Sequence, residues 1–228
     1  ISSEAVKQYR NKFIDLDALI FTNLAPEHIE SHGSYEKYLE AKLSIAFDLE
    51  KSPKKNKVLI VNIDDKEGEK FLGINILNKV TYSLSEVENI VLYEDKTAFS
   101  YKEVQIETAL PGKFNIYNIL GAIKYAEQEK IDLNTIRKSL FKIKEIKGRA
   151  QNINEGQDFK VIVDYAHTPD SLKAIYETFS NSKIIGVLGN CGGGRDKWKR
   201  KEMAEIADKY CKEAVLTDED PYDDEPKD

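Results

Sequence analysis

Residues 34–50, SYEKYLEAKLSIAFDLE, combine an apolar helical stripe with a lysine in its middle. Three-and-four spacing places six side chains on one face of an α-helix: Tyr35, Tyr38, Leu39, Ile45, Ala46 and Leu49. Lys42 lies within this stripe. Either its aliphatic stem follows the apolar face and the ammonium reaches water, or the amine occupies a site that alters its charge. The first alternative is the usual one for an isolated lysine.

The segment before this helix is rich in groups that bind metals. Thr22-Asn23-Leu24 is typical of a strand end, and it is followed by Glu27-His28-Ile29-Glu30 and Ser31-His32-Gly33. Carboxylate and imidazole groups are common metal ligands. A metal-binding loop beside Lys42 favours the second alternative, a lysine with altered charge.

Residues 21–42, FTNLAPEHIESHGSYEKYLEAK, resemble the central-domain signature of the Mur ligases. They are most similar to the branch that adds the third amino acid to UDP-N-acetylmuramoyl-dipeptide. The resemblance implies that Lys42 is carbamylated and bridges magnesium, and that His28 contacts a metal, so both are expected to be catalytic. Glutamate replaces both aspartates of the family's D-H-x-D element at Glu27 and Glu30. A partly desolvated lysine is neutral more often, and its carbamate would offer oxygen ligands suited to Mg²⁺.

Composition narrows the classes of partner. The chain has 228 residues, a net charge of −6 and 32% charged residues, so no broad basic face for nucleic acid is expected. No apolar run approaches the roughly 20 residues of a membrane span. Cys191 and Cys211 lack CxxC spacing and nearby histidines, which argues against zinc and for a reduced compartment. We expect a cytoplasmic monomer without membrane insertion.

The order of strand and helix patterns predicts an α/β fold in two domains, 1–147 and 148–228. The first contains expected strands at 19–22, 57–63, 81–83, 89–93 and 103–108, and helices at 115–129 and 133–141. In the second, strands at 159–163, 183–188 and 213–216 alternate with helices at 169–179 and 198–210, which is typical of a parallel, doubly wound sheet. The resemblance identifies these domains as the latter part of a central mononucleotide-binding ATPase domain and a truncated, Rossmann-like C-terminal domain.

Three motifs resemble the family's nucleotide-binding elements. DYAHTPD, residues 164–170, follows a predicted strand, and the resemblance assigns Asp164 and His167 to the nucleotide. GKFNIYN, residues 112–118, resembles a helix start whose asparagines lie by the adenine, here Asn115 and Asn118. Helix capping is an alternative for Asn115, whereas asparagine inside a helix is unfavourable at position 118. Gly148-Arg149-Ala150 resembles the hinge element whose arginine reaches ATP phosphates.

Further motifs resemble the family's substrate-binding elements. Near the start of the chain, ISSEAVKQYR resembles the element that holds the sugar nucleotide, which implies this role for Ser2, Gln8 and Arg10. GGGRDK, residues 192–197, resembles the loop whose arginine contacts the incoming amino acid, here Arg195. An isolated triple glycine is usually only a turn, but this one joins a predicted strand to a basic helix start.

The resemblance links the choice of the added amino acid to residues 219–222. Glu219-Asp220-Pro221-Tyr222 stand where enzymes that select diaminopimelate carry D-N-P-R. Tyrosine lacks the forked, charged contact of arginine, and the surrounding acids favour a substrate with a distal ammonium such as lysine. The alternative is that these acids form a solvated loop and that Arg195 alone sets selectivity.

The resemblance to the Mur ligases implies an ATP- and Mg²⁺-dependent amide ligase. It would join an amino acid (diaminopimelate, lysine or similar) to UDP-N-acetylmuramoyl-L-alanyl-D-glutamate through an acyl phosphate, in peptidoglycan precursor synthesis. Two alternatives remain: a related ligase such as a folylpolyglutamate synthase, or a non-catalytic nucleotide-binding relative. The sequence contains no G-x-x-x-x-G-K-[ST] phosphate loop. We therefore interpret the chain as an internal piece of the enzyme, inactive by itself.

Overall fold

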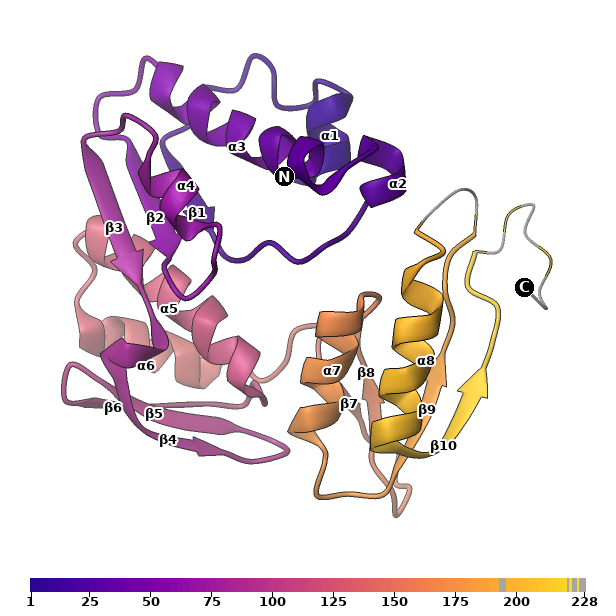
Figure 1. Ribbon diagram of the computed structural model, residues 1–228. Coiled ribbons are helices and arrows are strands. Elements are labelled where there is room, and N and C mark those ends of the chain that lie inside the picture. The colour runs from indigo at the N-terminus through magenta and orange to yellow at the C-terminus, as the bar shows by residue number, and fades with distance from the viewer. Residues whose placement is uncertain (193–195, 221, 223–224, 226–228) are drawn as a thin grey trace. The chain divides into compact units, whose positions relative to one another are not determined.

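The computed structural model describes residues 1–192, 196–220, 222 and 225 (Figure 1). Its contacts divide the chain into two compact units. The first unit comprises Ile1–Glu88, Ser100–Val104 and Ile116–Arg137, and the second comprises Asn89–Phe99, Gln105–Asn115 and Lys138–Asp228. Within the part of the chain described, no helix is both long and apolar enough to cross a bilayer.

A parallel sheet of three strands forms the centre of the first unit: β1 (Ala18–Phe21), β2 (Val58–Asn62) and β3 (Asn78–Tyr82), in the order β1-β2-β3. All five residues of β2 are buried. Such an unbroken apolar run is typical of a central parallel strand covered on both faces. The predicted strands at 19–22 and 57–63 are therefore confirmed, within a residue or two at each end.

Helices cover the sheet of the first unit. The helices before β3 are α1 (Ser3–Lys7), α2 (Ile29–His32), α3 (Tyr35–Lys51) and α4 (Gly68–Leu72). Ser34 caps α3 by accepting a hydrogen bond from Lys37 N at 3.3 Å. The predicted stripe is confirmed, because Tyr38, Leu39 and Leu49 of α3 are buried, and all three join Phe21 and Leu59 in one core cluster.

A second group of elements lies later in the chain. β4 (Val87–Leu92), β5 (Thr97–Tyr101) and β6 (Val104–Thr108) form a three-stranded sheet, followed by helices α5 (Lys113–Gln128) and α6 (Leu133–Lys142). Our sequence analysis did not predict β5. On α5, a Cβ at Gly121 would lie 3.3 Å from Ile20 Cγ2 and 3.4 Å from Tyr82 OH. The glycine thus lets α5 pack closely against β1 and β3.

A buried ion pair anchors α5 in the first unit. Lys124 is 8% exposed, pairs with Glu86 and lies 5.5 Å from the centroid of the Tyr101 ring. We expect Lys124→Met to lower the free energy of unfolding by about 2 kcal/mol, because it leaves a half-buried carboxylate unpaired. The control is Lys102→Met, which removes an exposed pair with Glu127 and should cost less than about 1 kcal/mol. Urea denaturation of both variants measures the difference, and equal losses would contradict the assignment.

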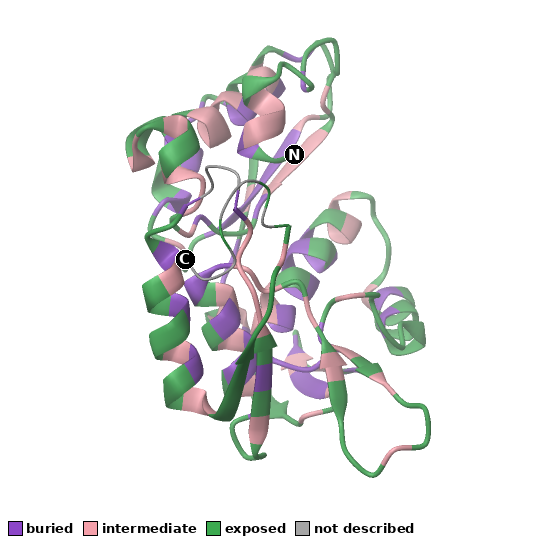
Figure 2. Cartoon of the chain, turned by 90° about the vertical axis from the view of Figure 1, so that its right-hand side faces the viewer, coloured by how far each residue is buried: buried purple, intermediate pink, exposed green. Residues whose placement is uncertain are grey.

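The second unit contains an antiparallel pair and a parallel pair of strands. β7 (Gln151–Ile153) pairs with β8 (Val161–Val163), and β9 (Ile184–Leu188) pairs in parallel with β10 (Cys211–Leu216). Helices α7 (Pro169–Thr178) and α8 (Lys199–Tyr210) pack on a cluster that includes Ile162, Ile184 and Leu188. Figure 2 shows the buried and exposed faces that make these helices amphipathic.

The predicted α/β class and the parallel pairing are confirmed in this unit. The strand predicted at 159–163, β8, does not join that parallel pair but pairs antiparallel with β7, which the sequence analysis did not predict. Thr168 caps α7 through a reciprocal pair with Ser171, and Pro169 occupies its first turn, as expected for a strand-loop-helix unit.

Candidate functional site

Lys42 lies half-buried on α3 with its amine beside an aromatic ring. Its Nζ is 5.8 Å from the centroid of the Tyr38 ring. Burial lowers the pKa of Lys42, and the charge of Glu27 opposes this shift. Among the residues that the structure describes, Lys42 has no hydrogen-bond or ion-pair partner. The amine therefore combines a lowered pKa with the absence of a polar partner among these residues.

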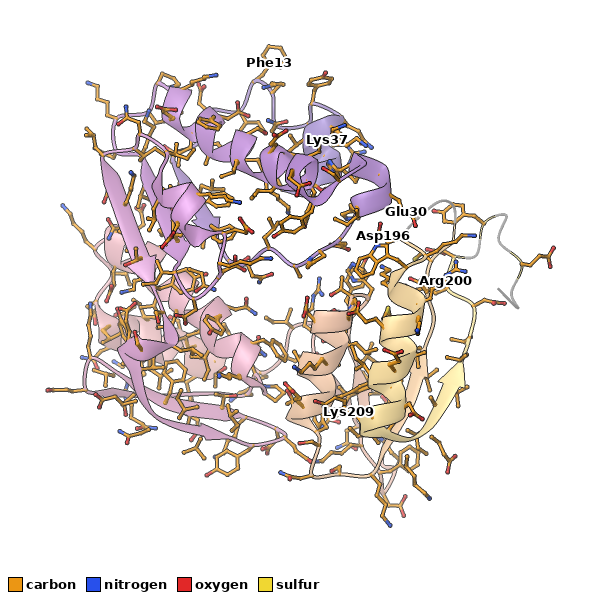
Figure 3. The ribbon with its side chains drawn as sticks, in the orientation of Figure 1. Phe13, Glu30, Lys37, Asp196, Arg200 and Lys209 are labelled. Atoms are coloured by element: carbon orange, nitrogen blue, oxygen red, sulfur yellow. The ribbon has the colours of Figure 1, made fainter. Side chains whose placement is uncertain are left out.

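His28 also lies near the ring of Tyr38. The rings of His28 and Tyr38 are 6.3 Å apart, and His28 Nε2 is 3.6 Å from Glu27 Oε1. His28 precedes the single turn of α2 in the left-handed conformation, with φ of 56°. Glu30 on α2 and Lys37 in the first turn of α3 mark this end of the first unit (Figure 3). The structure thus places both predicted metal-site residues around Tyr38.

The donor groups present suit magnesium only with a modified lysine. Among the described residues, no group of three or more His, Cys, Asp or Glu side chains could hold a metal. Mg²⁺ prefers oxygen ligands in near-octahedral geometry and usually keeps several waters. A free Lys42 amine would add no such ligand, whereas a carbamate on its Nζ would add two oxygens. The described side chains alone therefore do not complete a magnesium site.

Helix α1 is tied to the same loop through a polar cluster. Glu4 Oε1 accepts a hydrogen bond from Ser31 Oγ at 2.6 Å, and Lys7 Nζ donates to Ser31 O at 2.7 Å. His32 has a side chain only 4% exposed, with Nε2 3.4 Å from Glu4 Oε1. Burial lowers the pKa of His32 despite the neighbouring carboxylate. These contacts bring the α1 segment, with its predicted substrate residues, beside the predicted metal loop.

The predicted sugar-nucleotide residues lie along this helix and its end. Ser2 caps α1 by accepting from Ala5 N at 3.1 Å, so part of its role is structural. Gln8 and Arg10 are exposed, and neither side chain has a hydrogen-bond or ion-pair partner within the described chain. Both side chains are therefore available to a ligand.

The second unit brings Arg149, Asp164 and His167 together. Asp164 Oδ2 accepts from Ala150 N at 2.7 Å, and its Oδ1 accepts from Ala166 N at 2.8 Å. The Arg149 guanidinium carbon is 4.8 Å from the Tyr165 ring centroid. Two main-chain donors thus orient the carboxylate, and each oxygen keeps a lone pair for a hydroxyl group.

His167 is fixed at its ring and at its main chain. Its Nδ1 lies 2.8 Å from Tyr165 O, and its ring is 4.8 Å from the Tyr165 ring. Lys199, which is 5% exposed, donates from Nζ to His167 O at 2.9 Å. Our sequence analysis gave Lys199 no role, because a separation of 32 positions along the chain hides the contact.

The two asparagines of α5 differ in exposure. Asn115 is 5% exposed and donates from Nδ2 to Pro111 O at 2.7 Å, a structural contact with the residue four positions earlier rather than a helix cap. Asn118 is exposed and lies three residues later on the same helical face. Gly112 has φ of 92°, and a Cβ there would lie 2.7 Å from Thr178 Oγ1. This turn therefore requires glycine.

The predicted amino-acid residues are only partly described. Arg195 and Pro221 lie outside the described residues. Gly192 N donates to Asp220 O at 3.1 Å, which joins the loop after β9 to the loop after β10. A Cβ at Gly189 would lie 2.9 Å from Glu219 Cβ, so the two loops also pack closely. Tyr222 is 64% exposed.

Comparison with protein-family models gives two matches in order along the chain. Residues 1–126 match the Mur ligase middle domain, and residues 148–228 match the Mur ligase, glutamate ligase domain. The first match alone covers more than half of the 228 residues.

Curated relatives are similar over the whole chain. A UDP-N-acetylmuramoyl-L-alanyl-D-glutamate--2,6-diaminopimelate ligase of Halalkalibacterium halodurans is 35% identical over 239 residues, covering 100% of this chain and 49% of the relative. The enzyme of the same name from Syntrophomonas wolfei is 37% identical, covering 99% of this chain and 48% of the relative. The chain thus spans about half the length of the curated relatives it matches.

Solved structures agree in fold. One of a UDP-N-acetylmuramoyl-L-alanyl-D-glutamate--2,6-diaminopimelate ligase matches with a TM-score of 0.63 and 27% identity, covering 100% of this chain and 49% of that one. MurF from Acinetobacter baumannii matches with a TM-score of 0.75 and 18% identity, covering 91% of this chain and 48% of that one. The second likeness concerns the fold alone. With both family models matched in order, this chain belongs to the Mur ligase family.

Proposed function

We propose that the protein is an ATP-dependent amide ligase that joins an amino acid to UDP-N-acetylmuramoyl-L-alanyl-D-glutamate in peptidoglycan precursor synthesis. Within it, residues 1–147 would belong to the central domain and 148–228 to the C-terminal domain. The observation that carries the proposal is the similarity, over essentially all of this chain, to ligases named for this substrate. We place the enzyme in the cytoplasm as a monomer, with no nucleic-acid partner and no membrane insertion.

In the proposed reaction, the D-glutamyl carboxylate attacks the γ-phosphorus of ATP and displaces ADP. The resulting acyl phosphate is attacked by the amine of the incoming amino acid, which loses a proton as the amide forms and phosphate leaves. Both steps gather negative charge on oxygen atoms, so basic groups are needed nearby. Bound Mg²⁺ would neutralise part of that charge.

The metal site requires a modification of Lys42. The neutral amine would attack the carbon of CO₂ and lose one proton, which leaves a carbamate. The lowered pKa of Lys42 and its lack of a hydrogen-bond partner among the described residues support this step. His28, whose ring is 6.3 Å from that of Tyr38, would contact the metal.

The remaining residues would hold the three substrates. Asn115, Asn118, Arg149, Asp164 and His167 would bind the nucleotide, and Ser2, Gln8 and Arg10 the sugar nucleotide. Arg195 would meet the amino acid, near Glu219, Asp220, Pro221 and Tyr222. The oriented carboxylate of Asp164 supports a role in binding ribose hydroxyl groups.

The test is phosphate release by the intact enzyme with all three substrates, with each substrate omitted in turn. Release that requires the UDP-linked dipeptide supports the proposal. Folylpolyglutamate synthase from Mycobacterium tuberculosis shares the fold, with a TM-score of 0.71 at 16% identity. Release with a folate in place of the dipeptide would favour that function, and nucleotide binding without any release would favour the non-catalytic alternative.

The choice of amino acid follows from the acidic loop after β10. We expect the intact enzyme to prefer lysine or ornithine over meso-diaminopimelate by roughly tenfold in kcat/KM, because Tyr222 cannot pair with a second carboxylate as arginine does. The relatives are named for diaminopimelate, so this expectation differs from what their names state. Side-by-side ligation assays with the three amino acids provide the measurement. A clear preference for diaminopimelate would show that Arg195 alone sets selectivity.

A further inference from the structure

The loop that contains His28 is held at both ends by one short segment of the first unit. Asn62 Nδ2 donates to Thr22 O at 2.7 Å, and Asp65 Oδ2 accepts from Leu24 N at 2.9 Å, where the loop leaves β1. Glu67 Oε1 accepts from Tyr35 OH at 3.0 Å, where the loop enters α3. We refer to Asn62, Asp65 and Glu67 as the loop clamp.

Asp65 is the central member of the loop clamp. Its second oxygen, Oδ1, accepts from Glu67 N at 2.8 Å, so main-chain donors occupy both ends of the carboxylate. Leu24 is 3% exposed and belongs to the core of the first unit. A buried N–H that loses its acceptor cannot turn to water, so the contact with Asp65 determines where Leu24 lies.

Few main-chain hydrogen bonds lie within the loop itself. They are those of α2, from His32 N to His28 O at 2.9 Å and from Gly33 N to Ile29 O at 2.7 Å. A helix of four residues is not stable by itself. His28 also has φ of 56°, a conformation that side chains usually avoid. External contacts must therefore maintain this geometry.

The other end of the loop clamp fixes the helix that contains the lysine. Tyr35 is the first residue of α3, and Lys42 lies two turns later on the same face. Glu67 is 5% exposed and is also paired with Lys70 at 2.7 Å, so it is held in place when it binds Tyr35. The loop clamp thus contacts both the segment before His28 and the start of the helix that contains Lys42.

We propose that Asp65 is a positioning residue for the metal site, acting through Leu24 and the turn after β2 to set His28 relative to Lys42. The link to metal rests on the proposed function, whereas the restraint on the loop rests on the contacts alone. Since both oxygens of Asp65 bind main-chain N–H groups, its role is to orient the loop.

The test is Asp65→Asn in the full chain. An amide keeps one acceptor oxygen and turns an NH₂ group toward the other N–H donor. We expect amide hydrogen exchange in residues 23–33 to rise about tenfold, while β2 and β3 remain protected. With bicarbonate present, Mn²⁺ affinity, measured by electron paramagnetic resonance as a probe of the Mg²⁺ site, should fall about tenfold. The matched control is Asp17→Asn, an exposed aspartate before β1 in the same unit.

The outcomes separate the two parts of the proposal. Unchanged exchange in residues 23–33 overturns the restraint, and faster exchange with unchanged Mn²⁺ affinity overturns the positioning role. No Mn²⁺ binding by the unaltered chain refutes the proposed metal site and the positioning role with it, while exchange still judges the restraint. If Asp65→Asn does not fold, Tyr35→Phe removes only the contact with Glu67, and exchange should then rise in residues 29–35.

Discussion

Replacing Lys42 by alanine should lower the ligation rate of the intact enzyme by roughly a thousandfold, the scale expected when a group that organises charge stabilisation is lost. Alanine cannot form a carbamate, so the proposed oxygen ligands for Mg²⁺ would be lost. The half-buried amine beside Tyr38, with no hydrogen-bond partner among the described residues, is the basis of this expectation. Rates of phosphate release at saturating substrate provide the measurement.

Two further results distinguish a carbamate from a simple ammonium. Acetate or formate should partly restore the alanine variant, because a short carboxylate can enter the space left by the side chain. Lys37→Ala is the matched control, since Lys37 is exposed on the same helix five positions earlier, and it should retain full activity. Full activity of the Lys42 variant would contradict the modified lysine.

Changing Asp164 to alanine should raise the KM for ATP by roughly a hundredfold, with little change in the KM for the amino acid. Two effects add in the same direction. The variant would lose the proposed acceptor for ribose hydroxyls, and it leaves Ala150 N without its 2.7 Å partner, at a cost of about 1–3 kcal/mol. Initial rates with ATP and the amino acid varied separately measure both constants.

Asp170→Ala provides the control for Asp164. Asp170 is exposed in the first turn of α7, six residues further along the same motif. Its loss should leave both KM values within about twofold, because a single exposed acid at a helix start contributes little. If the Asp164 variant instead raised the KM for the amino acid more than that for ATP, these residues would belong to the other substrate.

Local sequence patterns predicted the helices and strands whose apolar residues follow a regular spacing. The stripe on α3 and the alternation of strands and helices after residue 158 were clear because each depends only on near neighbours. β5 and β7 were missed for a related reason. Residues 97–101 are nearly all buried and show no alternation, and residues 151–153 form a strand only by pairing with β8.

Sequence motifs pointed to Lys42 and His28 by their chemistry, and the structure brings both near Tyr38, while their roles stay predictions. The candidate site was less predictable where a contact joins distant positions. The bond between Asp65 and Leu24 spans 41 residues, and that between Lys199 and His167 spans 32. Neither spacing matches a local period, so only the folded chain reveals which polar groups meet. Ser2 and Asn115 also showed structural roles that a motif alone does not report.

The two bonds of Asp164 have a thermodynamic consequence. One carboxylate holds Ala150 in a left-handed conformation with φ of 45° and also faces the proposed nucleotide. Linkage requires the coupling between these two events to be reciprocal. If an ordered junction at residues 148–151 strengthens nucleotide binding, then bound nucleotide must order the junction by the same factor. A variant that loosens this short segment should therefore lose ATP affinity by the same factor by which bound ATP orders the segment.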